Sequence, residues 1–451
     1  MPFRAWRAIP YRMHRRHSII FQYPNFNSTL PPPWSSADHR IRSASGGRFL
    51  QLSSVVLALP FALANPVKTG DFEDGQPSDG KLKGGPILGG TNHALDLQNP
   101  DNLGRQSTDG GRVKSLKWSF SEGKTNIYNG GWIREQVITD LPQSHDIAGA
   151  QLHLKKGALR ELHWHTTAEW GYVYAGRMLI SAVDENGNYT VDTLKEGDIW
   201  YFPKGGAHTI QGLDDENEAL VAFDNGDFDA SGTTFMVDDW INHTPRDILA
   251  RNFGVDVSVF DDIPDKDPYI FNATSTTTPD SGPESGLTGP SAYIFHDSAT
   301  AASVPIPGGG GSISIVDSRN FPISTTIAAA IITLKPGALR ELHWHPNAEE
   351  WLYFHKGTAQ ATVFVGGGNS RTIDLVAGDV AVFPDNSGHY VLNTSPTEDL
   401  VWIELYKSER VADISLTQWL ALTPPDIVAS TLRISREVVD KLKKEKQLLL
   451  K

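Results

Sequence analysis

Pairs of histidines separated by one residue are the feature of this sequence best suited to chemistry. The segment GALRELHWH occurs at residues 157–165 and again, letter for letter, at residues 337–345. On an extended strand, residues i and i+2 point to the same face, so His163 is expected beside His165, and His343 beside His345. Neighbouring imidazoles are good ligands for a divalent transition metal. The repeated segment therefore predicts a metal site in each half of the chain.

Each half also supplies a carboxylate and a third imidazole. Glu169 follows His165 by four residues, and the turn PKGGAH brings His208 to the start of a later strand. In the second half the carboxylate is Glu349 or Glu350, and we choose Glu350 because, like Glu169, it precedes a tryptophan and stands seven residues before a glycine. The predicted ligand sets are His163, His165, Glu169 and His208, and His343, His345, Glu350 and His389.

Three imidazoles and one carboxylate leave open positions on a six-coordinate ion, where a substrate can bind. The same set holds Fe, Ni, Cu or Zn as well as Mn, so these residues alone do not identify the metal. The alternative is that the histidines are structural and fill a barrel core. Four ligand-type residues that recur in register after 180 residues favour the metal sites.

An arginine stands three residues before the first histidine of each pair, at Arg160 and Arg340. Strict strand alternation places it on the face opposite His163, unless the strand bends there. It is then a surface ion-pair partner or, if the strand bends, a planar fork that binds a carboxylate near the metal. The spacing leaves both interpretations open.

The elements that carry these residues belong to a duplicated domain. LKKGALRELHWH matches LKPGALRELHWH, and EGDIWYFPKGGAH parallels AGDVAVFPDNSGH, at offsets of 180 and 181 residues. Short alternating runs punctuated by Gly, Pro or Asn-Gly predict an all-β sandwich or barrel in each copy. Helical patterns are confined to TPRDILARNF and to SREVVDKLKKEKQLLL near the C-terminus.

Composition narrows the class of protein. The chain has 451 residues, a formal net charge of -13 and no cysteine. The negative charge argues against nucleic acid or an anionic membrane as a partner, because phosphate contacts need a basic face. The lack of cysteine excludes disulfides, thiolate chemistry and Cys-type zinc sites.

The N-terminal region differs from the rest of the chain. Residues 1–64 carry eight arginines and end in the apolar run LSSVVLALPFALA, which predicts a secretory signal peptide cleaved after Ala64. Sequons at Asn188, Asn242, Asn272 and Asn393 fit a secreted glycoprotein. The predicted organisation is an extension with signal peptide (1–64), an N-terminal arm (65–114), a first barrel (115–271), a linker (272–291) and a second barrel with a C-terminal helix (292–451).

From about Asn92 to the C-terminus, the chain resembles the bicupin oxalate decarboxylase/oxidase family. The pattern G-x5-H-x-H-x3,4-E-x6-G fits residues 157–176 and 337–357, and GDIWYFP, DDWINHTPRDILARNFGV and SLTQWLALTP add to the resemblance. It implies an all-β fold of two tandem cupin barrels with short peripheral helices. It also implies an enzyme that cleaves the carbon–carbon bond of oxalate, with two Mn²⁺ per chain, O2 as cofactor or co-substrate, and assembly into a homo-oligomer. In that scheme Arg160 or Arg340 stabilises the bound oxalate.

The choice between decarboxylase and oxidase depends on a proton donor. Decarboxylases of this family carry a Ser-Glu-(Asn/Asp)-Ser lid, whereas this chain has Asp229-Ala230-Ser231-Gly232-Thr233 in that place, which is more like the oxidase branch. Glu404 matches a second proton donor proposed for the family, with Asp224 as its counterpart in the first half, and Asp229 is a further candidate. We expect a decarboxylase that makes formate and CO2. The alternatives are an oxidase that makes CO2 and H2O2, and a non-enzymatic metal-binding cupin.

Overall fold

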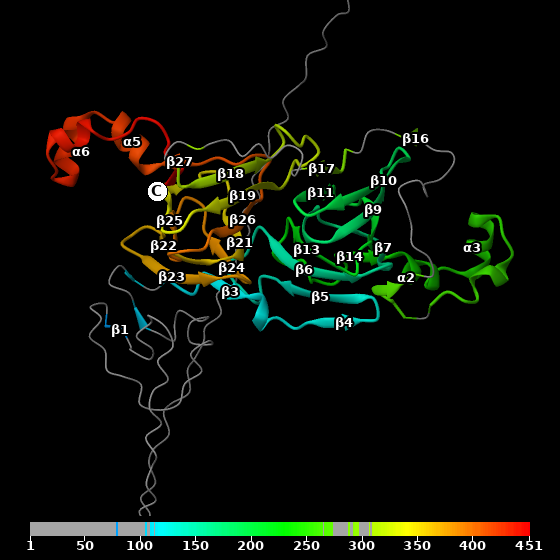
Figure 1. The fold of residues 1–451 in the computed structure, drawn as a ribbon. Coiled ribbons are helices and arrows are strands. Elements are labelled where there is room, and N and C mark those ends of the chain that lie inside the picture. The colour runs from blue at the N-terminus through cyan, green and yellow to red at the C-terminus, as the bar shows by residue number, and fades with distance from the viewer. Residues whose placement is uncertain are drawn as a thin grey trace, which may run out of the picture. The chain divides into compact units, whose positions relative to one another are not determined.

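A computed structural model describes residues 78–79, 104–105, 109–111, 113–264, 266–273, 287–288, 292–296, 306 and 309–451. The predicted signal peptide, most of the arm and most of the linker lie outside the described residues. The described part falls within one compact unit, Lys68–Lys451. It is built almost entirely from short strands, as the alternating runs predicted (Figure 1).

The first barrel is made of two facing sheets. Its strands are β4 (Asn126–Tyr128), β5 (Gly131–Gln136), β6 (Ala148–Lys155), β7 (Ala158–His165), β8 (Glu169–Ala175), β9 (Arg177–Val183), β10 (Asn188–Lys195), β11 (Asp198–Phe202), β12 (Ala207–Gly212), β13 (Glu216–Phe223), β14 (Thr234–Met236), β15 (Ile270–Asn272), β16 (Leu287–Thr288) and β17 (Ile294–His296). One sheet runs β17-β11-β8-β13-β6-β5-β4, and the other runs β14-β7-β12-β9-β10-β16 with β15 on β7.

The second barrel repeats this plan. Its strands are β18 (Gly311–Val316), β19 (Ala328–Leu334), β20 (Leu339–Trp344), β21 (Glu350–Lys356), β22 (Thr358–Phe364), β23 (Ser370–Val376), β24 (Asp379–Phe383), β25 (Gly388–Asn393), β26 (Leu400–Tyr406), β27 (Ile414–Ser415) and β28 (Leu449–Leu450), joined by β3 (Lys117–Ser119). The sheets run β18-β19-β26-β21-β24-β3 and β23-β22-β25-β20-β27, with β28 on β20. The predicted duplication is therefore present in the topology, and the tandem cupin fold is confirmed.

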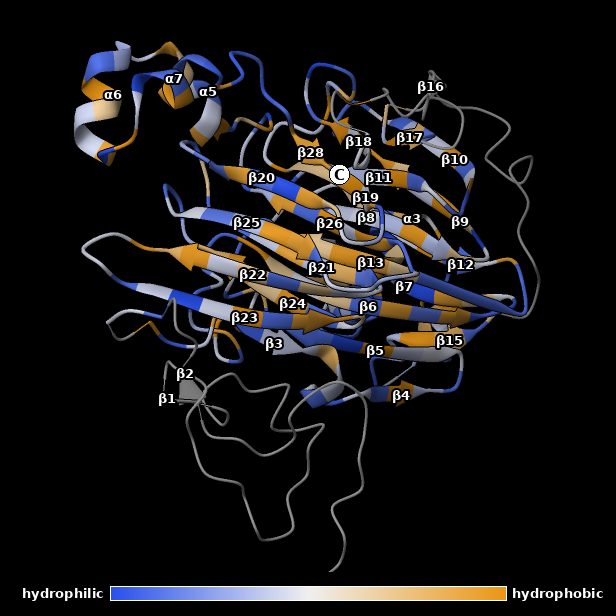
Figure 2. Cartoon of the chain, turned by 60° about the vertical axis from the view of Figure 1, so that its left-hand side comes forward, coloured by the Kyte–Doolittle hydropathy of each residue, from blue (hydrophilic) through white to orange (hydrophobic). Residues whose placement is uncertain are grey.

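Strand alternation divides most of the buried apolar residues among three large cores. On β13, Val221 and Phe223 point into the first barrel, whereas Leu220 points to a core shared by both barrels. On β26, Trp402 points into the second barrel and Ile403 into the shared core. Figure 2 shows the resulting mixture of hydrophobic and hydrophilic residues along the strands. The two barrels are thus packed back to back through one sheet of each.

The barrels also exchange edge strands. β3 comes from the predicted first barrel and pairs with β24 of the second, where Trp118 lies opposite Val380. β17 follows the predicted linker and pairs with β11 of the first barrel, where Ile294 lies opposite Trp200. Each barrel is completed by a strand from the other side of a predicted boundary. A further short pair, β1 (Ser78–Asp79) and β2 (Gly104–Arg105), lies in the arm.

The helices are short and peripheral. They are η1 (Phe120–Glu122), α2 (Val237–Asn242), α3 (Arg246–Phe253), η2 (Val257–Phe260), α5 (Leu416–Leu422), α6 (Pro425–Leu432) and α7 (Arg436–Asp440). In Figure 1, α2 lies beside strands of the first barrel and α5 beside strands of the second, whereas α3 and α6 project away from the strands. Among the described helices, none is long and apolar enough to cross a membrane.

The C-terminal helix is shorter than the sequence pattern predicted. Only Arg436–Asp440 is helical, and the chain then ends in β28, which pairs with β20. Leu449 is fully buried in the core of the second barrel. The run of lysines after Asp440 offers no apolar face for a longer helix, whereas burying the terminal leucines on an open strand edge removes apolar surface from water.

Candidate metal centres

The first predicted ligand set converges inside the first barrel. β7 supplies His163 and His165, β8 begins with Glu169, and β12 supplies His208; all four are buried, and their ligand atoms lie within 4.8 Å of one another. The Glu169 Oε2 atom lies 3.0 Å from Nε2 of His165 and 3.2 Å from Nε2 of His208. Because β12 pairs with β7 so that His208 lies directly opposite His163, residues 45 positions apart meet at one point.

Hydrogen bonds orient the three imidazoles. Nδ1 of His163 donates to the Glu161 carbonyl (2.5 Å) and Nδ1 of His208 to the Gly206 carbonyl (2.8 Å), while Nδ1 of His165 lies 3.0 Å from Oγ1 of Thr234. A carbonyl only accepts, so the ring proton of His163 and of His208 is on Nδ1 and the Nε2 lone pair faces the cluster. Such partners hold the tautomer and ring angle that a metal ligand needs.

The second set converges in the same way in the second barrel. The ligand atoms of His343, His345, Glu350 and His389 lie within 4.8 Å of one another, and all four residues are buried. Glu350 Oε2 lies 2.9 Å from Nε2 of His389 and 3.5 Å from Nε2 of His345. The Nδ1 atoms donate to the carbonyl groups of Glu341 (2.6 Å), Ala412 (2.8 Å) and Ser387 (2.8 Å). Glu349, the alternative carboxylate, instead accepts a hydrogen bond from the Asp146 backbone at 2.7 Å.

Both clusters suit a divalent cation. Nε2 of His165 and Oε2 of Glu350 are buried and form no hydrogen bond of acceptable geometry, although each lies close to a facing ligand atom of its cluster. Burial opposes ionisation of Glu169, but His208 and His165 outweigh it and hold the pKa of Glu169 well below its usual value. Burial and Arg160 lower the pKa of His163 well below its usual value. Neutral imidazoles and an ionised carboxylate are the protonation states that bind metal.

A β-bulge places the arginines beside the metal ligands. Between Arg160 and His163, strand β7 takes three steps while β12 takes two, from Ile210 to His208. The same shift occurs on β20 between Arg340 and His343. The extra residue cancels the alternation, so Arg160 turns inward with the histidines and Leu162 turns outward, 54% exposed. The spacing left open a surface position and a position near the metal. The structure places both arginines near the metal ligands.

The two arginines have different partners. The Arg160 guanidinium lies 3.7 Å above the ring of Tyr269, and its Nη1 makes long contacts to Met236 Sδ (3.5 Å) and the Tyr269 carbonyl (3.4 Å). Arg340 is held by a hydrogen bond from Nη2 to Asp413 Oδ2 at 2.8 Å, and its Nε and Nη1 are buried without a partner. Each guanidinium therefore keeps donors that a bound carboxylate can use.

Glu404 lies on β26 beside the second cluster. Its Oε1 accepts from Trp402 Nε1 (3.0 Å), and its Oε2 lies 2.7 Å from the Tyr406 hydroxyl, which is 3.3 Å from Glu350 Oε1. It is 1% exposed. Burial and the charge of Glu350 raise the pKa of Glu404, which favours the protonated acid.

The first-barrel counterpart of Glu404 is Val221, and the prediction of Asp224 was wrong. Glu404 lies opposite Ala330 on β19, and Val221 lies opposite Ala150, the duplicate of Ala330, on β6. Asp224 lies beyond the end of β13, where its carboxylate accepts from the Ala168 backbone at 2.9 Å. Asp224 stands 180 residues before Glu404, the offset between the two copies of the repeated segment. That offset does not apply at β13 and β26, because the loop before β26 is longer than the loop before β13.

The predicted lid, residues 229–233, forms a turn between β13 and β14. Asp229 is exposed, and Thr233 Oγ1 donates to the carbonyl groups of Phe228 (2.5 Å) and Ala230 (2.9 Å). The pocket inside the first barrel is lined by ligands of the cluster, by Arg160 and Tyr269, and by apolar residues such as Val221 and Phe223. Asp229 is not among the lining residues of that pocket.

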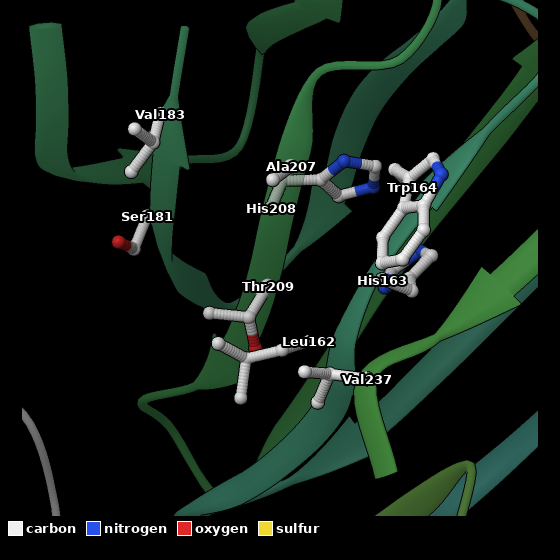
Figure 3. Close-up of a pocket in the computed structure, with 9 residues that line it drawn as sticks. All are labelled: Leu162, His163, Trp164, Ser181, Val183, Ala207, His208, Thr209 and Val237. Carbon is white, nitrogen blue, oxygen red and sulfur yellow. The ribbon is translucent and has the colours of Figure 1, made fainter. Parts of the chain in front are cut away.

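Each barrel also has an apolar groove on its outer face. In the first barrel Leu162, Trp164 and Val183 contribute to it, and in the second Leu342, Trp344 and Phe364 take the equivalent places. Figure 3 shows the imidazole of His208 turned toward His163 and Trp164 and away from Val183. The same strands thus present metal ligands inward and apolar side chains outward.

Sequence reasoning missed the residues that support the ligands from neighbouring strands. Trp200 Nε1 donates to Glu169 Oε1 at 2.9 Å, and in the second barrel the Tyr406 hydroxyl takes this role toward Glu350. Asp413, which holds Arg340, was also missed. Alternation within DIWYF and WIELY was the available signal for Trp200 and Tyr406. Nothing local marked Asp413.

Two tandem cupin barrels, each with a buried cluster of three histidines and one glutamate, define a bicupin metalloprotein. The sequence profile of the cupin family matches residues 119–260 and 301–440. The chain is 57% identical over 405 residues to a probable oxalate decarboxylase of Arthroderma benhamiae, covering 89% of this chain and 100% of that protein. It is 42% identical over 373 residues to an oxalate decarboxylase of Bacillus subtilis, covering 82% and 95% of the two chains.

A solved structure of the Bacillus subtilis oxalate decarboxylase, described by its Mn(II) centres, superposes with a TM-score of 0.78 at 40% identity, over 84% of this chain and 100% of that one. The chain belongs to the bicupin oxalate decarboxylase family.

Proposed function

We propose that this protein is a manganese-dependent oxalate decarboxylase that converts oxalate to formate and CO2. The observation that carries the proposal is a buried cluster of three histidines and one glutamate in each barrel with a buried arginine beside it. Its relatives at 42–57% identity are named oxalate decarboxylases. The Mn(II) centres of the Bacillus subtilis structure support manganese, with two ions per chain.

Different residues bind the substrate and transfer the proton. Bound manganese supplies a Lewis acid that coordinates one carboxylate of oxalate. The guanidinium of Arg160 or Arg340 donates to the other carboxylate. The apolar lining of the first pocket, which includes Val221 and Phe223, favours release of neutral CO2 from a dianionic substrate. In the second barrel, protonated Glu404 is placed to give its proton to the carbon of the nascent formate.

The alternative function, an oxalate oxidase, is argued from the sequence of the lid. The lid has no glutamate, and its one acid, Asp229, is exposed rather than directed into the pocket. An intermediate that is not protonated is available to O2, which yields CO2 and H2O2. Dependence on O2 is part of the proposal for both reactions.

Secretion is a further part of the proposal, supported by the signal-peptide pattern of residues 52–64. Of the four sequons that follow the predicted cleavage site, Asn188 and Asn272 are exposed and suit glycosylation. Asn393 does not, because it is 1% exposed and its amide donates to the carbonyl groups of Leu334 and Glu398, both at 2.9 Å. Mass spectrometry of the secreted protein should find glycan at Asn188 or Asn272 and none at Asn393.

A homo-oligomer is supported by the apolar outer grooves. Trp240 and Trp419 are 65% and 54% exposed at equivalent places beside the two grooves. Contiguous exposed apolar patches, as opposed to single exposed side chains, mark interaction surfaces. Analytical ultracentrifugation should show a species heavier than the 49.5 kDa chain.

One assay tests the reaction. The purified protein, loaded with Mn²⁺, is given oxalate under air, and formate, H2O2 and CO2 are measured. Formate equal to the oxalate consumed supports the decarboxylase. Stoichiometric H2O2 without formate supports the oxidase, and no loss of oxalate overturns both. Elemental analysis should find two Mn per chain, and His208→Ala or His389→Ala should each reduce this to one.

A further inference from the structure

The first pocket contains no proton donor from the predicted set. Among the described residues that line it, Glu169 is the one carboxyl, and as a metal ligand it must stay ionised. The position equivalent to Glu404 is occupied by Val221. The lid offers only the exposed Asp229. If the proton of formate comes from a carboxylic acid in the first barrel, that acid is not among the described residues that line this pocket.

Residues that lie directly opposite one another on neighbouring strands form a row across the sheet. The row that contains Val221 also contains an acid, two strands away from Val221. Glu135 on β5 is opposite Ala150 on β6, and Ala150 is opposite Val221 on β13. The equivalent row of the second barrel reads Ile315 on β18, Ala330 on β19 and Glu404 on β26. Each row thus has an acid at one end and an aliphatic residue at the other. The acid is on β5 in the first barrel and on β26 in the second, so the two barrels carry it at opposite ends of the row.

The side chain of Glu135 starts from the inner face of β5. Ile133 and Val137, two residues to either side, both belong to the core of the first barrel. Ile133 also lines the pocket. The intervening Gln136 is on the other face, where its side-chain Oε1 accepts from Trp351 Nε1 of the second barrel at 2.8 Å. Alternation along β5 therefore directs Glu135 toward the inside of the first barrel, where it is partly buried.

Glu135 has charged and titratable groups near it, some in the pocket and one in the lid. It interacts with Arg160 in the pocket, with Asp229 in the lid and with Asp140, and it influences the phenols of Tyr128 and Tyr269. Burial raises the pKa of Glu135; Asp229 and Asp140 act in the same direction, and Arg160 opposes them. Glu135 thus lies within electrostatic range of both the substrate-side arginine and the solvent-exposed lid acid.

We propose that Glu135 is the proton donor of the first barrel. The inference rests on the proposed decarboxylase function. When the carbon–carbon bond of oxalate breaks, CO2 leaves and the bonding pair remains on the other carbon. That carbon takes the proton of Glu135 to form the C–H bond of formate. The Glu135 carboxylate then takes a proton from water, so one oxalate dianion and one proton give one formate and one CO2.

The test compares Glu135→Gln, Glu404→Gln and the double variant, all loaded with Mn²⁺. In the Glu404→Gln background, Glu135→Gln should lower formate formation by about 10²-fold or more and raise the share of H2O2. KM for oxalate and the two Mn per chain should be unchanged. Glu135→Asp should restore part of the rate, and Glu185→Gln, in an exposed loop, should behave as the parent chain.

A readout independent of turnover accompanies the rates. Infrared difference spectra recorded during a pH titration should contain the band of a protonated carboxyl that is missing in Glu135→Gln. The inference is overturned if Glu135→Gln leaves formate formation unchanged in the Glu404→Gln background, or if that background makes none while Glu135→Gln alone matches wild type. It is also overturned if activity falls only because Mn is lost. A wild-type protein that makes no formate overturns the proposed function instead.

Discussion

At the scale of single residues, the two centres have the same types of ligand and differ in the residues that surround the ligands. Arg160 stacks on Tyr269 with long polar contacts, whereas Arg340 is bonded to Asp413. Glu404 is buried beside the second centre, and Val221 stands at its place in the first. Because the metal ligands are alike, these neighbours are where differences in reaction and rate must arise.

Glu404 can be tested with the first centre disabled. In a His208→Ala chain we expect formate to come only from the second barrel, and Glu404→Gln should reduce it by about 10²-fold or more, because the amide has no proton of suitable acidity. Formate is measured by enzymatic assay, with His208→Ala alone as the control. Equal rates in the two chains would rule out Glu404 as the donor.

Asp413 should make stability depend on pH. Burial disfavours its charge, but Arg340 and Lys446 more than compensate and lower the pKa of Asp413 to about 2. Since the folded pKa lies below the ordinary value, the stabilisation is complete above about pH 4 and is lost as the pH falls toward 2. Asp413→Asn should therefore lower the free energy of unfolding by about 2 kcal/mol near neutral pH and by progressively less in acid.

Denaturant unfolding of wild type and Asp413→Asn at several pH values measures this difference. Asp399→Asn, which removes a more exposed partner of Lys335, is the matched control and should change stability by less than about 1 kcal/mol. A difference between wild type and Asp413→Asn that does not shrink in acid would contradict the assignment.

At the scale of elements, the bulge on β7 and β20 has the largest consequence for function. Without it, Arg160 and His163 would face opposite sides of the sheet, and no guanidinium from this strand would reach the pocket. The bulge also turns Leu162 and Leu342 out into the apolar grooves. One irregular residue per strand therefore serves both the inner site and the outer surface.

The lid is the second element whose sequence bears on the reaction. Ser231→Glu places a carboxyl on an exposed turn near the mouth of the first barrel, and we expect the ratio of formate to H2O2 to rise. The ratio is measured in the Mn-loaded protein under air. Ser430→Glu, on exposed α6, carries the same charge change away from both centres and should leave the ratio as in wild type. An unaltered ratio in Ser231→Glu would show that the lid does not control the outcome.

At the scale of the whole molecule, the barrels are joined by a shared core and by exchanged strands. Trp351 of the second barrel donates to Gln136 of the first at 2.8 Å, and Tyr353 accepts from Gln151 at 2.8 Å. β3 completes a sheet of the second barrel, and Phe120 directly after it is fully buried against Tyr353. Neither barrel can unfold without exposing apolar surface of the other.

Thermal unfolding should therefore show one calorimetric transition for both barrels. Phe120→Ala should lower stability by about 3–5 kcal/mol and shift the single transition to lower temperature. Ile127→Ala, at an 80% exposed position on β4, is the control and should leave it in place. Two separate transitions, in wild type or in Phe120→Ala, would contradict the coupling.

The sequence by itself determined the fold, the duplication and the membership of each ligand cluster. These depend on local spacing: residues i and i+2 share a face of a strand, and an exact repeat carries that geometry to a second place. The choice of Glu350 over Glu349 also followed from spacing within one segment, and the structure places Glu350 with the three histidines.

The tertiary structure decided what depends on pairing between strands distant in the chain. The inward turn of Arg160 requires the bulge, which is defined only against β12. Register between strands determines that Val221 is the counterpart of Glu404 and that Glu135 is the acid of the first barrel. The hydrogen bond that Arg340 donates to Asp413 also joins residues distant in the chain. Loop lengths differ between the copies, so a constant offset in the sequence loses this register, whereas hydrogen bonds between strands preserve it.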